Sequence, residues 1–138
     1  MNVRTILTNI VSFVTPKMHA TRQKAVTDCV YSLANGSTAT VTSIGRGIDS
    51  KAYEKHSIKR ADRLLSNPHL LCEKTSIYAA VCQLFCTAKH PTISIDWSDL
   101  DDCKRHFLLR AALSFDGRAI TLYEEVHPLS TKEKPATH

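Results

Sequence analysis

Asp96 lies in a sequence context where a carboxylate needs a positively charged partner. It stands between Ile95 and Trp97, in a stretch where apolar and polar residues alternate as in a half-buried strand. Because a charged group among apolar neighbours is costly unless it is paired, we expect Asp96 either to pair with Arg110 or to bind a cation. The aspartates that follow are typical turn formers and helix caps: Asp99, Asp101 and Asp102.

A second group of residues with chemical potential is a set of lysines and arginines around a helix that is predicted to end at Leu65. The apolar stripe of this helix is expected at Ile58, Ala61 and Leu65, and the basic residues fall mostly off that stripe. They are Arg46, Lys51, Lys55, Lys59, Arg60 and Arg63. Cations opposite the core could meet phosphates or base edges, so all six are candidate DNA contacts. The alternative is a solvated helix face, which is the commoner origin of such a run.

The five cysteines favour reduced thiols over a disulfide or metal site. Their number is odd, and the chain begins without the features of a signal peptide. Cys82 and Cys86 are spaced to share one face of a helix, and His90 is the only further zinc ligand at a suitable distance along the chain. We expect both thiols to be structural.

Hydrophobic periodicity predicts that residues 1–90 are all helical. Thr40 is a candidate N-cap, and Ser50 or Ser57 could cap the helix that ends at Leu65. The sequence predicts helices over residues 3–14, 26–33, 41–46, from one of those serines to residue 65, and 72–85. A short helix, a turn with glycines and a basic second helix form the outline of a helix-turn-helix.

After His90 and Pro91 the periodicity changes from helical to alternating. Strands are predicted over residues 93–97, 105–115 and 118–127, with a type I′ turn at Asp116-Gly117 between the last two. This turn places residues opposite each other when their numbers sum to 233, so that Leu113 faces Ile120, Ala111 faces Leu122 and Phe107 faces Val126. The predicted fold class is therefore α+β, with a helical domain over residues 1–90 and three antiparallel strands in residues 91–138.

Charge is distributed unevenly along the 138 residues, whose net charge is +5. Residues 1–90 have a net charge of +7 and residues 91–138 a net charge of −2. A basic region suits phosphate binding, and an acidic region suits metal binding. No apolar run approaches the roughly 20 residues of a membrane span, so no membrane association is expected and a cytoplasmic location is the default.

Several strings in the chain resemble the insertion-sequence transposases of bacterial cut-and-paste elements. The most specific strings are ISIDWSDL and FLLRAALSFDGRAITLYEEVHPL, while SIGRGI and KHSIKRADRLLSN resemble the DNA-binding region of the same family. The resemblance covers about residues 38–134. These transposases belong to the Asp-Asp-Glu superfamily, whose catalytic core has a ribonuclease-H-like fold.

The resemblance implies a mechanism in which three carboxylates hold two divalent ions, usually Mg²⁺, for DNA cleavage and strand transfer. Asp96 matches the first carboxylate and would be both a catalytic residue and a metal ligand. The second Asp and the Glu of the family fall in regions that these 138 residues do not include, and Asp116, Glu124 and Glu125 do not replace them. We therefore expect residues 91–138 to be the truncated start of the catalytic domain, and the chain alone to be catalytically incompetent.

The same resemblance implies the partners and the setting of the protein. The expected partner is double-stranded DNA at the ends of the element, with a homodimer in the complete protein and a bacterial, nucleoid-associated location. Ser130-Thr131-Lys132-Glu133 has the form of a capping box, which predicts that a further helix begins there. The alternative function is a non-catalytic DNA-binding remnant or a regulator of transposition.

Overall fold

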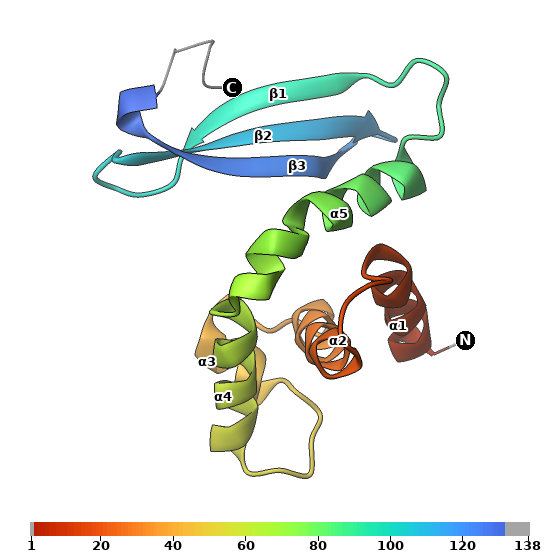
Figure 1. The fold of residues 1–138 in the computed structure, drawn as a ribbon, viewed down its shortest axis with the longest axis vertical. Coiled ribbons are helices and arrows are strands. Elements are labelled where there is room, and N and C mark those ends of the chain that lie inside the picture. Colours follow the sequence, from red (N-terminus) through yellow and green to blue (C-terminus); the bar gives the residue numbers. More distant parts are fainter. Residues whose placement is uncertain (1, 132–138) are drawn as a thin grey trace. The chain divides into compact units, whose positions relative to one another are not determined.

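A computed structural model of the chain describes residues 2–131, which form five helices, three strands and a short 3₁₀ turn (Figure 1). The chain divides into two compact units, residues 1–80 and residues 81–138. The helices are α1 (Val3–Val14), α2 (Ala20–Ala34), α3 (Val41–Arg46), α4 (Glu54–Leu65) and α5 (Pro68–Phe85). The strands are β1 (Ile93–Asp99), β2 (His106–Phe115) and β3 (Arg118–Pro128), and the 3₁₀ turn is Leu129–Thr131. This content confirms the predicted α+β class, while the predicted domain boundary at residues 90/91 stays a prediction.

Local signals place most helix ends where the sequence predicts them. The helix α1 ends before Pro16, and α2 is followed by Gly36, whose φ of 96° is the left-handed conformation that glycine adopts readily. Thr40 caps α3, because its side-chain oxygen accepts the Ser43 N–H at 3.2 Å. These three boundaries follow from single residues, which is why they can be read from the sequence.

Three predicted helix starts are wrong. The helix α2 begins at Ala20, six residues before the predicted start at residue 26. The helix α4 begins at Glu54 with Tyr53 at the cap position, so neither Ser50 nor Ser57 caps it. The helix α5 begins at Pro68, four residues before the predicted start at Cys72. A proline fits the first turn of a helix because its missing N–H would have no partner there. The Asn67 side-chain oxygen accepts the His69 N–H at 2.9 Å and satisfies another orphan donor of that first turn.

The core of the first unit lies where α2, α3 and α4 meet. Its buried apolar residues are Cys29, Ile44, Ile48, Ala61 and Leu64. On α4 the buried positions are Ser57, Ala61 and Leu64, so the predicted stripe that ended at Leu65 is wrong by one residue, and Leu65 is exposed. Burial raises the pKa of the Cys29 thiol, with a further contribution from neighbouring Asp28. All five cysteines are free thiols, and Cys82 and Cys86 are half-buried.

Close contact between α3 and α4 depends on a glycine. A Cβ atom added at Gly45 would lie 2.4 Å from the Ile58 Cα atom, which is backbone and has no room to move away. The absence of a side chain at Gly45 therefore allows the two helices to pack at very short distance. Any larger residue at this position would push α3 and α4 apart.

A buried carboxylate links three helices of the first unit. Asp28 on α2 is 2% exposed and accepts hydrogen bonds from Arg4 on α1 at 2.6 Å, from Lys24 at 2.9 Å and from Arg60 on α4 at 2.9 Å. The Arg4 guanidinium also lies 5.2 Å from the centre of the Tyr31 ring. A buried carboxylate is tolerated only when it is paired, and here the three cations meet that requirement.

The second unit is built on an antiparallel sheet with the strand order β1-β2-β3. Asp116 and Gly117 have φ values of 49° and 71°, as the predicted type I′ turn requires at both central positions. Between β1 and β2, the Asp101 carboxylate accepts the Arg105 N–H at 3.0 Å and contacts the His106 ring at 3.0 Å. These hydrogen bonds lower the pKa of Asp101 from its ordinary value.

The predicted hairpin register holds only near the turn. Leu113 faces Ile120 as predicted, but Ala111 faces Tyr123 and Phe107 faces His127. The register shifts between Ala111 and Ala112, so that Leu122 is an extra residue on β3. Leu122 is buried, and its carbonyl oxygen lies 3.8 Å from the Cys82 Sγ atom. The predicted helix start at residues 130–133 falls mainly outside the described residues.

Replacing Asp28 with Asn tests the buried ion cluster. The substitution keeps the size of the side chain but leaves Arg4, Lys24 and Arg60 without their shared negative charge. We expect the free energy of unfolding to fall by about 2–3 kcal/mol, less than for a fully buried pair because the three cations are partly exposed. Urea denaturation followed by helical circular dichroism measures the change.

The matched control is Asp49→Asn. Asp49 also pairs with Arg4, at 3.4 Å, but its side chain is 82% exposed, so the expected loss is below about 0.5 kcal/mol. Equal effects of the two substitutions would contradict a special role for Asp28.

A candidate nucleic-acid interface on the first unit

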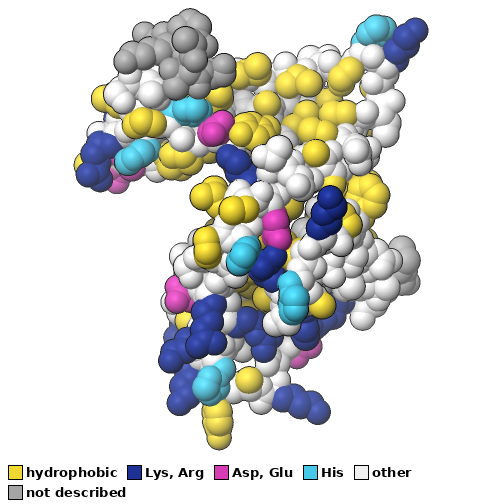
Figure 2. Space-filling model, viewed as in Figure 1, with side chains coloured by type: hydrophobic (Ala, Val, Ile, Leu, Met, Phe, Trp, Pro, Cys, Tyr) yellow, Lys and Arg dark blue, Asp and Glu magenta, His cyan; other side chains and the backbone are white. Residues whose placement is uncertain are grey.

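Three basic side chains form a stripe on the exposed face of α4. Lys55, Lys59 and Arg63 follow one another at intervals of four residues and fall within a sector about 80° wide around the helix axis. The buried residues Ser57, Ala61 and Leu64 lie on the opposite side of the helix, as the sequence predicts for cations and core. We call these three basic residues the α4 stripe. Figure 2 shows Lys and Arg side chains gathered over α3 and α4.

The six predicted DNA contacts differ in how many partners they already have. Lys51 lies in the turn before α4 and is exposed, like the members of the α4 stripe. Within residues 2–131, neither Lys51 nor the α4 stripe makes an ion pair with a carboxylate. Arg46 pairs with Glu54 at 2.9 Å, and Arg60 pairs with buried Asp28. The structure therefore places four of the six as free surface cations and two in ion pairs.

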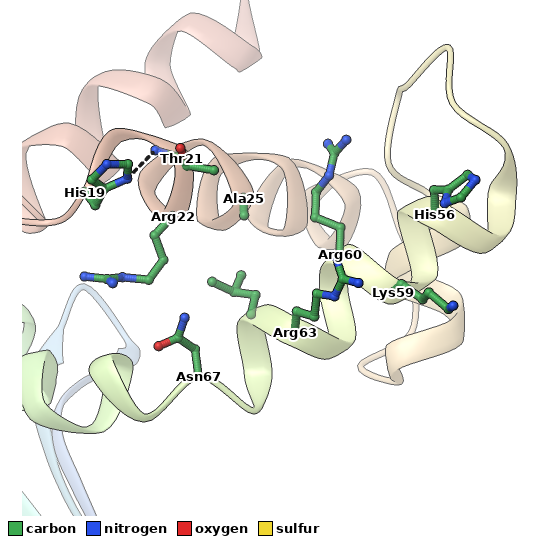
Figure 3. Close-up of a pocket in the computed structure, with 10 residues that line it drawn as sticks. His19, Thr21, Arg22, Ala25, His56, Lys59, Arg60, Arg63 and Asn67 are labelled. Carbon is green, nitrogen blue, oxygen red and sulfur yellow. Dashed lines mark hydrogen bonds between the residues drawn. The ribbon is translucent and has the colours of Figure 1, made fainter.

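A groove between α2 and α4 lies beside this stripe (Figure 3). Its volume is about 650 Å³. The residues that line it are His19, Thr21, Arg22, Ala25, His56, Lys59, Arg60, Arg63, Leu64 and Asn67. This lining holds four cationic side chains, two imidazoles and no carboxylate. Its composition suits a negatively charged ligand, because each cation in the lining attracts it.

Arg22 is a groove residue that sequence reasoning missed. It lies in the first turn of α2, where the positive end of the helix dipole and the guanidinium both contribute positive electrostatic potential. A signal for it exists in the sequence, because Arg22 stands four residues before Val26 and seven before Cys29, on the stripe that packs against the core. An arginine at such a position must lie at the margin between two helices. His19 and His56 also line the groove and were not among the predicted site residues.

Asp96 is not in the desolvated setting that its neighbours in the sequence suggest. It is exposed on β1, and neighbouring Ile95 is 72% exposed, so the carboxylate has no burial cost to offset. The strand register places Asp96 directly opposite Arg110, as one of the two expectations requires. The Arg110 guanidinium, however, makes its ion pair with Glu124 on β3 at 2.6 Å.

The side chains around Asp96 do not form a site for two divalent ions. The nearest residue across the sheet is a cation, and Glu124 on the far side of it is already paired with Arg110. Among the described residues, no group of three or more His, Cys, Asp and Glu side chains is arranged to hold a metal ion.

Comparisons with known proteins give no relative of this chain. No family model, no curated protein and no solved structure matches it. Across the part of the chain that the structure describes, no helix is both long enough and apolar enough to span a membrane.

Proposed function

We propose that this chain is the N-terminal part of an insertion-sequence transposase of the Asp-Asp-Glu type, and that it binds double-stranded DNA at the ends of its element. The observation that carries the DNA-binding part of this proposal is the α4 stripe of Lys55, Lys59 and Arg63. These cations lie opposite the core, and no carboxylate among residues 2–131 neutralises them. Unpaired cations along one helix face attract the phosphates of DNA.

The dimensions of α4 suit this role. A residue rise of 1.5 Å places successive members of the α4 stripe about 6 Å apart along the helix, so the stripe is about 12 Å long. The major groove of DNA is about 12 Å wide and admits an α-helix. A helix lying there could direct its basic side chains to the phosphates and base edges along the groove.

The arrangement of α3 and α4 supports a helix-turn-helix role for this pair. The short helix α3, the turn after it and the basic helix α4 pack tightly through Gly45 and Ile58. In helix-turn-helix proteins the second helix enters the major groove, and the first crosses the backbone. By this analogy α4 is the recognition helix, and Arg46 at the end of α3 and Lys51 in the turn contact the DNA backbone.

The antiparallel order of β1, β2 and β3 supports our assignment of the second unit as the start of a ribonuclease-H-like core. Asp96 would then be the first catalytic carboxylate and a ligand of Mg²⁺ in the complete enzyme. The metal would activate the attacking oxygen and stabilise the leaving one, but it needs further carboxylates that residues 2–131 do not bring to Asp96. The catalytic form would therefore require carboxylates beyond those that residues 2–131 supply, and we propose a homodimer only for that complete form.

The Arg110–Glu124 pair favours a second candidate function, a DNA-binding remnant or regulator without catalysis. Arg110 lies opposite Asp96, so the row of three residues across the sheet has a cation at its centre. A chain of this kind would occupy element ends without cutting them. Both functions share the α4 stripe and differ in whether the remaining carboxylates are supplied by another polypeptide.

Replacing Lys55 and Lys59 with Gln tests DNA binding by α4. We expect the double variant to bind a 20-base-pair duplex of arbitrary sequence at least tenfold more weakly at low salt, because two phosphate contacts are lost. The slope of log K against log salt concentration should decrease in magnitude by about 2. Fluorescence anisotropy with labelled DNA at several salt concentrations measures both quantities.

Lys89→Gln combined with Lys104→Gln provides a control with the same change of net charge in the second unit. Both residues are exposed, and the double variant should bind DNA like the original chain. Equal loss of affinity in the two double variants would mean that only net charge matters, and would contradict a specific role for α4.

We also expect that the purified chain does not cleave or join DNA. A nuclease and strand-transfer assay with Mg²⁺ should give no product, because a single carboxylate cannot hold two metal ions in the required geometry. The Asp96→Ala variant serves as the control. The prediction would be contradicted if the original chain showed metal-dependent activity and the Asp96→Ala variant did not.

A further inference from the structure

The groove between α2 and α4 offers more positive charge than the α4 stripe alone. Lys59 and Arg63 belong to both the stripe and the groove, whereas Arg22 belongs only to the groove and comes from another helix. An anion in the groove would therefore be attracted from two sides, by α2 and by α4. Figure 3 shows Arg22 and Arg63 on the two helices that border this space.

Among the described residues, Arg22 pairs with one carboxylate, which does not line the groove. Its Nη2 atom pairs with the Glu73 carboxylate of α5, within the first unit. The pair is incomplete among the described residues, since the buried atoms Nε of Arg22 and Oε2 of Glu73 have no hydrogen-bond partner. A guanidinium has five N–H donors in a planar fork, so Arg22 can bind a second anion while it still contacts Glu73.

We propose that this groove binds a phosphate of the DNA backbone, that Arg22 is one of its ligands, and that Glu73 weakens the binding. This inference rests on the proposed function and adds a second contact surface to it, on α2. The phosphate gains attraction from Arg22, Lys59 and Arg63. It is repelled by the Glu73 carboxylate, which shares the Arg22 guanidinium and neutralises part of its charge.

The two members of this ion pair therefore have opposite effects on DNA affinity. Arg22→Gln removes a phosphate ligand, so DNA should bind about fivefold more weakly, with a salt slope smaller by about 1. Glu73→Gln removes the competing negative charge and leaves Arg22 available, so DNA should bind about threefold more tightly. A purely structural salt bridge predicts another pattern, because losing either partner breaks the same contact and would change affinity in the same direction.

The experiment measures DNA affinity of the full chain and of both variants by fluorescence anisotropy, with the same 20-base-pair duplex. A decrease for Arg22→Gln together with an increase for Glu73→Gln supports the proposal. A decrease in both variants, or no change in Arg22→Gln, overturns it. Arg22→Lys keeps the charge but loses the fork, and it should restore part of the affinity lost in Arg22→Gln.

A second measurement separates this proposal from the proposed function. Titration of the ¹⁵N-labelled chain with inorganic pyrophosphate should shift the NMR signals of Arg22 and Arg63 more than those of Lys51, which lies outside the groove. If DNA does not bind but pyrophosphate produces these shifts, the proposed function fails together with the DNA part of this proposal, and the groove is a site for a phosphate from another source. DNA binding could instead depend on Lys55 and Lys59 while Arg22→Gln leaves the DNA affinity unchanged and pyrophosphate does not shift the Arg22 signal. In that case the groove proposal fails and the proposed function remains.

Discussion

The first unit depends on a buried negative charge at Asp28. This carboxylate lies on α2 and joins Arg4 of α1 and Arg60 of α4, so one side chain ties three helices together. The apolar core beside it is small, with five buried apolar residues. Because an unpaired carboxylate cannot be buried cheaply, the helices must stay where their cations reach it. The orientation of α4 is therefore set by charge as well as by packing.

The orientation of α4 determines which of its basic residues remain available. Arg60 is directed to Asp28, and the α4 stripe is left on the outer face with no carboxylate partner among the described residues. The contact between Gly45 and Ile58 fixes the same helix against α3. The groove beside α2 is a consequence of both constraints, because its lining comes from the faces of α2 and α4 next to their contact. One short helix thus carries both a cation that is paired inside the unit and cations that remain on its surface.

The sequence predicts elements well where a single residue decides the outcome, and poorly where partners distant in the sequence decide it. The Asp116-Gly117 turn and the Thr40 cap are local, and both are confirmed. The bulge at Leu122 shifts the register within the hairpin, and the alternating pattern carries no signal for it. The ion pair of Arg60 with Asp28 spans 32 positions, and nothing near Arg60 in the sequence distinguishes it from Lys59. The exposure of Asp96 likewise depends on what covers β1, which its apolar neighbours do not specify.

We propose above all that the first unit binds double-stranded DNA through α4. The most direct test is an NMR titration of the ¹⁵N-labelled full chain with a 20-base-pair duplex at low salt. We expect the largest chemical-shift changes at Lys55, Lys59 and Arg63, with small changes along β1, β2 and β3. Largest changes on the strands, or no change at any residue when DNA is in excess, would contradict it.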